Sequence, residues 1–399
     1  MEIMKNKLPL LISILSLIAI IAVTSIQNKP QIKTSSKKAI NTSSIKIETE
    51  LRGVWISFLE LDMAGTDRSY QSFKERFKRI ADNSKEKKFN TLIVQVRPYS
   101  DALYNSSYYP FSHIISGIQG KDPEYDPLKY MCAYAHKIGL KIHAWVNPYR
   151  IRSSKELKLS DDNPYMNNRD LGVKVGNGIY YNPALPKVRR LIENGVKEIV
   201  DNYDVDGIQF DDYFYPTKSE NFDKIQYEKY KRNVGSDKAL SLKEWRKANV
   251  NILVADCYTI VHNSKENVVF GISPQGNIDN DYEMYADIYS WCTKSGYIDY
   301  ICPQLYYSLD NPALSFERAL KSWTDIEYNP DVNLYIGLAG YKAGTDADSG
   351  TWEKSDNILQ KEVKMVRENK INGFMFFSYN NLETVKAKSE VKNLVKVLN

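Results

Sequence analysis

Short apolar runs alternate with longer amphipathic segments along the chain from residue 51 onward. The short runs have the period-two or continuous apolar pattern of strands, whereas apolar residues recur every three or four positions in the longer segments, as in helices. The predicted strands cover 52–58, 91–97, 141–147, 207–212, 268–275, 298–306, 334–340 and 373–379. The predicted helices lie near 68–88, 126–139, 185–203, 241–263, 281–295, 312–327, 352–369 and 382–398.

This strict alternation of eight strands with eight helices predicts an α/β fold, a (β/α)8 TIM barrel with enlarged loops. A doubly wound open sheet also alternates strands and helices, but no glycine-rich phosphate-binding turn follows the first predicted strand. The longest insertions follow the third strand, at about 151–184, and the fourth, at about 213–240. Both leave the carboxyl ends of strands, where barrels carry their chemistry.

The first fifty residues have a different character. Two lysines precede an apolar run over residues 8–26, a pattern typical of an export signal and just long enough to span a bilayer. We expect residues 1–26 to be a signal peptide or a membrane anchor, with a slight preference for the anchor. Residues 27–50 are predicted to be a disordered stalk, and 51–399 the barrel domain. We therefore expect the barrel to be exported, to the extracellular face of the membrane or to the cell wall. If residues 1–26 are not cleaved, they also attach the protein to the membrane.

Charge and composition narrow the function. The formal net charge of the chain is +5, but residues 1–50 hold seven lysines and three glutamates, which leaves +1 for the remainder. A nearly neutral barrel argues against nucleic acid as a partner, because such proteins carry a basic surface. The chain contains 29 tyrosines and 6 tryptophans, whose flat apolar faces and polar edges suit sugar rings and also fill large cores.

Metal and cofactor sites are not expected. The four histidines form no His-x-His or His-Glu-x-x-His motif, and the four cysteines lack the spacing of metal ligands. The cysteines are better interpreted as small buried residues, although a Cys292–Cys302 bridge is a minor alternative.

The fourth predicted strand ends in two adjacent carboxylates. Because side chains alternate across a strand, Gly207, Gln209 and Asp211 share one face, while the residues between them share the apolar face. Adjacent acids such as Asp211 and Asp212 repel each other and are usually placed together for a purpose. The structural alternative is that one of them merely caps the next turn.

Four other strands show the same separation of a polar line from an apolar line. The polar lines are Ile93, Gln95 and Arg97; His143, Trp145 and Asn147; Gly271, Ser273 and Gln275; and Cys302, Gln304 and Tyr306. An inert barrel fills its interior with aliphatic layers. Polar lines on five converging strands therefore predict a polyhydroxylated ligand, such as a glycan polymer, since buried polar groups need partners. A purely structural hydrogen-bond network is the alternative.

Hydrolysis of a glycosidic bond needs two carboxyl groups. Asp211 is the first candidate for nucleophile or charge stabiliser, and Asp212 is the second. The general acid stays open between Asp101, Glu60 and Asp62, each of which also fits a loop or capping role.

Two further polar residues have two interpretations each. Arg97 is expected either to pair with Asp211 and keep it ionised or to bind an acidic group of the substrate. His143 is either a ligand donor or a satisfied core histidine.

Several of these segments together resemble the glycosyl hydrolase-like 10 family. The matching segments are Arg52-Gly53-Val54-Trp55, Gln95-Val96-Arg97-Pro98 with Ser100-Asp101-Ala102-Leu103-Tyr104, His143 to Arg150, Phe210 to Pro216, Gly271 to Pro274, and Pro303 to Tyr307. They occur in order over essentially residues 51–380. The continuation Pro274-Gln275-Gly276 departs from the family pattern, in which Phe and Gly follow the proline.

The resemblance implies a (β/α)8 barrel, an exported or envelope location and glycosidase action, with peptidoglycan glycan lacking stem peptides as the expected substrate. The catalytic candidates are Asp211, Asp212 and Asp101. The candidate substrate-binding residues are Trp55, Arg97, His143, Trp145, Asn147, Tyr149, Arg150, Gln209, Tyr213, Gln304 and Tyr306. A non-catalytic carbohydrate-binding barrel of the cell surface is the alternative. A metal-dependent hydrolase or deacetylase needs a ligand cluster that the sparse histidines and scattered cysteines do not supply.

Overall fold

A single parallel sheet forms the centre of the computed structural model, which describes residues 50–399. Its strands are β1 (Leu51–Ile56), β2 (Thr91–Arg97), β3 (Lys141–Val146), β7 (Gly207–Phe210), β8 (Val269–Ile272), β9 (Tyr300–Ile301), β10 (Asn333–Leu334), β11 (Ile336–Leu338) and β12 (Gly373–Phe376). They are hydrogen-bonded in the order β10-β9-β8-β7-β3-β2-β1-β12-β11. Barrel strands that follow one another along the chain therefore lie side by side in the sheet, as in a (β/α)8 barrel.

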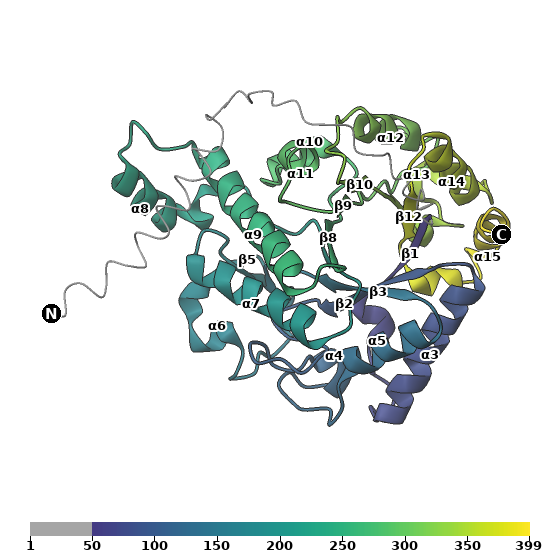
Figure 1. Cartoon of the computed structure of the whole chain (residues 1–399), viewed down its shortest axis with the longest axis horizontal. Coiled ribbons are helices and arrows are strands. Elements are labelled where there is room, and N and C mark those ends of the chain that lie inside the picture. Colours follow the sequence, from purple (N-terminus) through teal and green to yellow (C-terminus); the bar gives the residue numbers. More distant parts are fainter. Residues whose placement is uncertain (1–49) are drawn as a thin grey trace, which may run out of the picture. The chain divides into compact units, whose positions relative to one another are not determined.

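The sheet closes on itself at β10 and β11. These two segments are halves of one strand that is interrupted at Tyr335, and the halves pair with opposite edges of the sheet. The backbone N–H groups of Tyr335 and Gly337 donate to the carbonyls of Ile301 (2.9 Å) and Pro303 (2.8 Å). Within residues 50–399 the sheet is thus an eight-stranded barrel, which confirms the predicted (β/α)8 fold and rules out an open doubly wound sheet (Figure 1).

The helices surround this barrel (Figure 1). The longer ones are α3 (Tyr70–Glu86), α5 (Pro127–Lys137), α7 (Pro186–Asn202), α9 (Leu242–Ser264), α12 (Phe316–Thr324), α14 (Ile358–Glu368) and α15 (Lys388–Lys396). The predicted helix at 281–295 is replaced by two short ones, α10 (Ile278–Glu283) and α11 (Ile288–Thr293). The break occurs because Tyr285 has a left-handed backbone with φ of 65°.

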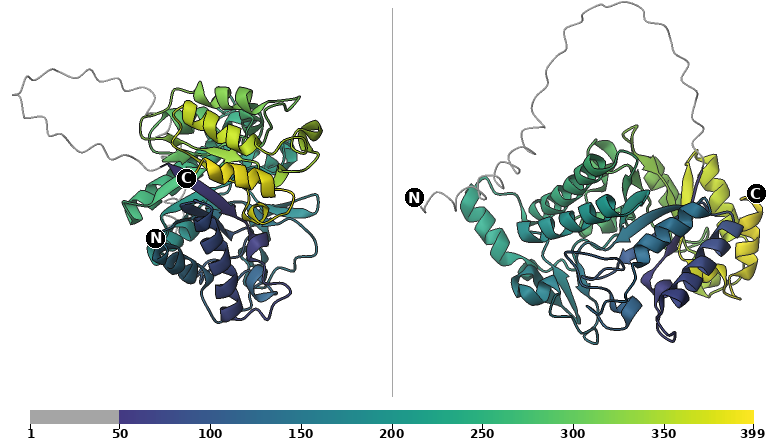
Figure 2. Two further views of the ribbon diagram at one scale, coloured as in Figure 1. Left: turned by 90° about the vertical axis from the view of Figure 1, so that its right-hand side faces the viewer. Right: turned by 60° about the horizontal axis from the view of Figure 1, so that its bottom comes forward.

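Short helices and an extra sheet lie in the loops. The short helices are α2 (Phe58–Leu61), α4 (His113–Ser116), α6 (Pro164–Asn167) and α13 (Ala347–Gly350), and the loops also hold the longer α8 (Lys224–Val234). A three-stranded antiparallel sheet, in the order β4 (Arg150–Arg152), β6 (Gly178–Tyr181) and β5 (Gly172–Val175), occupies the enlarged loop after β3. The enlarged loop after β7 carries α8, which lies at the periphery of the molecule (Figure 2).

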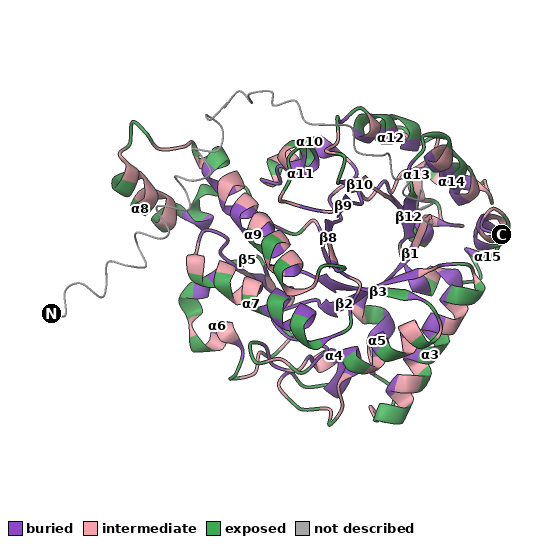
Figure 3. Cartoon of the chain, viewed as in Figure 1, coloured by how far each residue is buried: buried purple, intermediate pink, exposed green. Residues whose placement is uncertain are grey.

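Burial follows the predicted alternation of side chains. The outward faces of the strands and the inward faces of the helices form the main apolar core, and the solvent side of the helices is exposed (Figure 3). A second cluster lies inside the barrel and consists of Trp55, Ile93, Trp145, Tyr300, Cys302 and Met375. Glycines make room for its rings, because a Cβ atom on Gly271 would stand 2.2 Å from the Tyr300 ring. The interior is therefore aromatic and polar rather than aliphatic.

The predicted export signal or anchor and all of the predicted stalk but its last residue lie outside the described residues. Glu50, that last residue, pairs with Arg52 (2.7 Å) and Arg367 (2.7 Å). No helix among residues 50–399 is both long enough and apolar enough to cross a membrane. Cys292 and Cys302 are free and buried, so the alternative of a bridge between them is wrong.

Candidate active site

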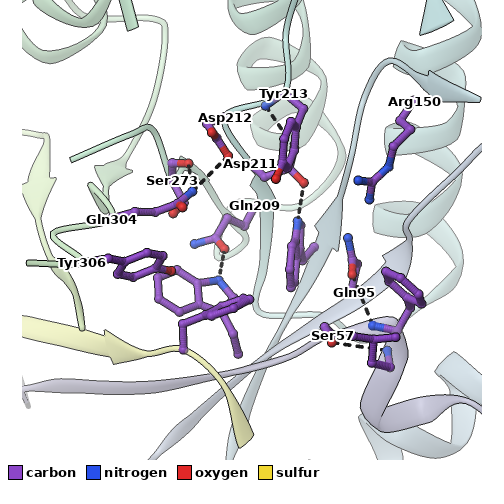
Figure 4. A pocket seen from close by; sticks show the side chains of 15 residues that line it. Ser57, Gln95, Arg150, Gln209, Asp211, Asp212, Tyr213, Ser273, Gln304 and Tyr306 are labelled. Carbon is purple, nitrogen blue, oxygen red and sulfur yellow. Dashed lines mark hydrogen bonds between the residues drawn. The ribbon is translucent and has the colours of Figure 1, made fainter. Parts of the chain in front are cut away.

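A pocket of about 180 Å³ lies where the barrel strands end (Figure 4). It receives side chains from the ends of seven strands and the loops that follow them. The lining residues are Trp55, Ser57, Phe58, Leu59, Gln95, Trp145, Arg150, Gln209, Asp211, Asp212, Tyr213, Ser273, Gln304, Tyr306 and Phe377. In the part of the chain that the structure describes, Asp211 and Asp212 are the only residues with carboxyl side chains that line the pocket.

Asp211 is held in the pocket wall by donors from β3 and the residue after it. Its Oδ2 accepts a hydrogen bond from Trp145 Nε1 (2.9 Å) and another from Asn147 Nδ2 (3.1 Å). The register of the sheet places these groups together, since Trp145 of β3 is paired with Gln209 of β7. Asp211 is 3% exposed. Burial raises the pKa of Asp211 to about 7, with a further increase from Asp212 and a decrease from Arg150.

Asp212 turns into the same pocket because the strand has ended before it. Its Oδ1 accepts a hydrogen bond from Gln304 Nε2 (3.1 Å), and Gln304 also donates to the carbonyl of Ser273 (3.1 Å). Burial raises the pKa of Asp212, while the hydrogen bond from Gln304 lowers it. Two carboxyl groups with raised pKa values thus share one enclosed site, which is the arrangement expected for acid–base chemistry.

Arg150 forms one side of the pocket. Its guanidinium lies between two rings, 4.9 Å from the centre of Tyr99 and 5.3 Å from that of Tyr213. Its Nε donates to the carbonyl of Pro98 (3.0 Å). The other two guanidinium nitrogens make no hydrogen bond within residues 50–399, and the group points towards the pocket (Figure 4). The charge is therefore fixed in position with donors still available.

Aromatic rings form the opposite wall. Phe377 lies 5.9 Å from Trp55, 6.4 Å from Trp145 and 5.7 Å from Tyr306, measured between ring centres. Tyr213 stands at the rim and is 53% exposed. Rings of this kind stack on the apolar faces of sugars, while nearby amides bind the hydroxyl groups.

Gln209 ties this wall to the barrel interior. Its Oε1 accepts a hydrogen bond from Trp55 Nε1 (2.6 Å), and its Nε2 donates to the hydroxyl of Tyr300 (3.2 Å). The side chain is fully buried below the rings. It therefore holds Trp55 in place as well as lining the pocket.

Nine of the candidate site residues line the pocket together, and so do Gln95 and Ser273 of the predicted polar lines. Of the nine, two are the candidate catalytic residues Asp211 and Asp212, and seven are candidate binding residues, namely Trp55, Trp145, Arg150, Gln209, Tyr213, Gln304 and Tyr306. Asn147 does not line the pocket, but it holds Asp211 and accepts a hydrogen bond from the backbone of Arg150 (3.0 Å). It is therefore a positioning residue.

The expected contact between Arg97 and Asp211 is wrong. The pairing of β2 with β3 shifts by one residue after Gln95, so that Arg97 is opposite Val146 and shares its outward direction. The Arg97 guanidinium lies 4.6 Å from the ring centre of Tyr109 and outside the pocket. A bulge of this kind turns the side chain to the other face of the strand.

His143 and Tyr149 also lie outside the pocket. His143 is deep in the barrel, where its Nδ1 is 3.1 Å from the hydroxyl of Tyr300. Burial lowers the pKa of His143 to about 4, so the ring is neutral and fits the core-histidine interpretation. Tyr149 is fully buried in the main core around the barrel. Neither side chain is placed to contact a ligand in the pocket.

The three alternative acids are placed elsewhere as well. Asp101 is fully buried and contacts His113 Nδ1 (3.2 Å) and Gln119 Nε2 (2.9 Å), away from the pocket. Glu60 completes the N-terminal capping box of α2 with Ser57, and Asp62 accepts from the backbone of Ala64 (2.9 Å). Asp101, Glu60 and Asp62 therefore do not line the pocket, and Asp211 and Asp212 remain as the candidate catalytic carboxyl groups.

Four lining residues were not predicted from the sequence, namely Ser57, Phe58, Leu59 and Phe377. The first three follow β1, where a one-turn helix brings backbone and side chains to the rim. Phe377 follows β12 and continues the inward line of Gly373 and Met375, so applying the strand alternation to the eighth strand would have found it. The aromatic wall is thus partly built from the two strands at which the chain begins and ends its barrel.

The profile of the family described as Glycosyl hydrolase-like 10 matches residues 50–353. The chain is 36% identical over 358 residues to glycosyl hydrolase YngK of Bacillus subtilis, an alignment that covers 84% of this chain and 69% of YngK. It is 32% identical over 328 residues to glycosyl hydrolase DigH of Escherichia coli K12, with 74% of each chain covered.

Two solved structures with a similar fold are domains of glycoside hydrolases. The glycoside hydrolase domain of PgaB (BpsB) from Bordetella bronchiseptica superposes with a TM-score of 0.55 at 11% identity, covering 88% of this chain and 99% of that domain. The catalytic domain of β-amylase from Paenibacillus polymyxa gives a TM-score of 0.56 at 12% identity, covering 88% and 98% of the two chains. At these identities the likeness concerns the fold alone.

Proposed function

This chain belongs to the glycosyl hydrolase-like 10 family, and on that premise we propose that it hydrolyses glycosidic bonds with Asp211 and Asp212 as its catalytic pair. The observation that carries the proposal is the enclosure of these two carboxyl groups in one aromatic pocket at the carboxyl end of a barrel. Asp211 has a pKa raised to about 7 by burial, and Asp212 lies beside it.

The two carboxyl groups take different roles. A carboxyl group that titrates near neutral pH suits proton donation, so Asp211 protonates the glycosidic oxygen as the carbon–oxygen bond breaks. Burial raises the pKa of Asp212, but the hydrogen bond from Gln304 and the charge of Arg150 oppose this increase and favour its carboxylate. Asp212 is therefore assigned to stabilising the positive charge that develops on the sugar. Water then adds to the anomeric carbon, and the proton that the water loses returns to the carboxyl pair, which restores the protonated Asp211. This assignment differs from the role of nucleophile first considered for Asp211.

The proposed substrate is peptidoglycan glycan that lacks its stem peptides. Removal of the peptide leaves a free carboxylate on the lactyl ether of each muramic acid unit. Arg150 supports this choice, because two of its guanidinium nitrogens have no hydrogen-bond partner in residues 50–399 and together fit a carboxylate. The neighbouring rings of Tyr99 and Tyr213 hold this receptor in place.

Such a substrate is found outside the cytoplasm. We therefore propose that the chain is exported and acts at the cell surface or in the cell wall. The basic and apolar pattern over residues 5–26 supports this location.

The direct test compares wild type with the Asp211→Asn/Asp212→Asn double variant on glycan strands first stripped by an amidase. Release of reducing ends is expected to fall by about a hundredfold or more, because proton transfer is lost. Asp310→Asn, at an exposed aspartate, is the matched control. If wild type releases no more ends than the double variant, the proposal fails, and retained binding of the strands would favour a non-catalytic carbohydrate-binding barrel.

A second experiment tests the substrate. Reducing the lactyl carboxylates to alcohols is expected to lower kcat/KM of wild type by about tenfold, the value of one charge-assisted hydrogen bond. The Arg150→Gln variant should lose nearly all sensitivity to that reduction. Equal sensitivity in both proteins would show that Arg150 does not recognise the carboxylate.

A further inference from the structure

A second pocket, of about 480 Å³, lies in loops on one side of the barrel. One wall comes from the chain after β2 and includes Tyr99, His113 and Gln119. The other wall comes from residues 153–158, which follow β4 in the enlarged loop after β3. Nothing in the acid–base chemistry proposed above uses this pocket.

A buried carboxylate organises one of its walls. Asp101 is fully buried, and its Oδ2 contacts both His113 Nδ1 (3.2 Å) and Gln119 Nε2 (2.9 Å). Its Oδ1 is buried without a hydrogen-bond partner. Because Nδ1 of His113 faces the carboxylate, Nε2 is left as the polar atom for the pocket, where it makes no hydrogen bond within residues 50–399. A side chain fixed from behind by a buried partner is typical of a preorganised binding site.

One aromatic ring separates this pocket from the candidate active site. The Tyr99 ring lies 5.6 Å from Phe58 and 4.9 Å from the guanidinium of Arg150, both of which line the active-site pocket. The same ring lies 5.9 Å from His113, which lines the second pocket. The Tyr99 side chain, which is 9% exposed, therefore lies between two adjoining pockets.

We propose that the second pocket is a saccharide-binding site that holds a neutral sugar unit of the same glycan chain, remote from the bond that is cleaved. This inference rests on the function proposed above. The exposed side chain of Ile118 and the small uncovered part of Tyr99 offer apolar surface for a sugar ring, and His113 and Ser153 offer polar contacts.

The charges on the pocket favour a neutral unit over an anionic one. Lys158 and Glu156, of opposite sign, both line it, so no excess of unpaired cations is present to bind phosphate or carboxylate. Asp101 is thus assigned to positioning His113 and Gln119 at this second pocket rather than to proton transfer. The motif that contains Asp101 thus serves the second pocket and does not line the active-site pocket.

The test measures how the enzyme responds to chain length. For wild type and His113→Ala, kcat/KM is measured on a long stripped glycan strand and on an aryl disaccharide too short to reach past Tyr99. The ratio of the long-chain to the short-chain value is expected to fall about five- to tenfold in His113→Ala, the loss of one hydrogen bond and its packing. Ser153→Trp, which fills the pocket from an exposed position, should lower the ratio in the same direction.

His262→Ala is the matched control, because His262 is also partly exposed and pairs with an aspartate, Asp299 (3.0 Å), but lies outside both pockets. Its ratio should equal that of wild type. If His113→Ala and Ser153→Trp change long-chain and short-chain hydrolysis equally, or change neither, the second site is ruled out.

A binding experiment separates this inference from the proposed function. Calorimetry on Asp211→Asn, with and without His113→Ala, compares the affinity for long and short oligosaccharides of the stripped glycan. A preference for the long oligosaccharide that His113→Ala reduces supports the second site even if wild type hydrolyses nothing. Equal affinity for long and short oligosaccharides overturns the second site even if hydrolysis is observed.

Discussion

Trp145 and Asp211 are joined by a hydrogen bond of 2.9 Å between the indole Nε1 and the carboxylate Oδ2, although they lie 66 positions apart in the sequence. The parallel pairing of β3 with β7 brings them together. The bond favours the ionised form of a carboxyl group whose burial favours the neutral form. The balance of these two effects leaves Asp211 able to gain or lose a proton near neutral pH.

The first prediction concerns the pH dependence of hydrolysis. Because the pKa of Asp211 is raised from 3.8 to about 7, its proton is present below this pH and lost above it. If Asp211 donates that proton, kcat/KM falls as the pH rises through about 7. Stopped assays on stripped glycan strands between pH 5 and 9 measure this. A rise in kcat/KM over the same interval would instead assign Asp211 as nucleophile.

The second prediction concerns Trp145→Phe. This change keeps an aromatic ring but removes the N–H group that stabilises the Asp211 carboxylate. The pKa of Asp211 is expected to rise by about one to two further units, since a hydrogen bond to a charged group contributes about 1.5–3 kcal/mol. The alkaline limb of the pH profile should move upward accordingly.

The control for this variant is Trp323→Phe, which removes an indole hydrogen bond to the carbonyl of Gly276 outside the active-site pocket. Its pH profile should match that of wild type. An unchanged alkaline limb in Trp145→Phe would show that the indole does not tune Asp211.

The third prediction separates the roles of the two carboxyl groups. A proton donor is dispensable when the leaving group departs as a stable anion, as dinitrophenolate does. Asp211→Asn is therefore expected to lose much less activity on a dinitrophenyl glycoside than on the natural linkage. Asp212→Asn should lose activity on both substrates, because charge on the sugar develops in either case. The reverse pattern would exchange the two roles.

The fourth prediction is that the active site costs stability. The pKa of Asp211 is higher in the folded chain than the ordinary 3.8, so the folded state holds the proton more tightly than the unfolded state. The resulting contribution to the free energy of unfolding is fully present below pH 3.8 and is lost as the pH rises to about 7. A difference of roughly three units corresponds to at most about 4 kcal/mol. Asp211→Asn should therefore unfold at higher urea concentration than wild type at pH 8, with a smaller gain at pH 5. A constant difference at both pH values would contradict this origin.

The fifth prediction concerns the enlarged loop after β7. Asp223 in this loop forms an ion pair with Arg246 of α9 (2.5 Å), and both side chains are fully buried. Asp223→Asn leaves a buried guanidinium without its counter-charge and is expected to lower the free energy of unfolding by about 3–5 kcal/mol. Asp325→Asn breaks an exposed pair with Lys321 and should cost less than about 1 kcal/mol in the same urea titration. Similar costs for both variants would contradict this estimate.

Sequence periodicity predicted the barrel because each βα unit carries its own signal. The strands at 91–97 and 141–147 and the helix predicted near 126–139 were recognisable from local apolar spacing alone, and their observed bounds differ by a few residues at most. The same local rule placed Gln209 and Asp211 on the inward face. It failed at Arg97, because a shift in the pairing of β2 with β3 reverses the direction of that side chain.

The sequence by itself determined the fold, the family motifs and the strand end that supplies the two carboxyl groups, because each of these follows from a pattern among residues close together in the chain. Only the tertiary structure decided which groups surround those carboxyls. It brought Trp145 to Asp211 and Gln304 to Asp212, and it directed Asp101 to His113. Contacts between residues far apart in the chain depend on the register and closure of the barrel, which no local pattern specifies.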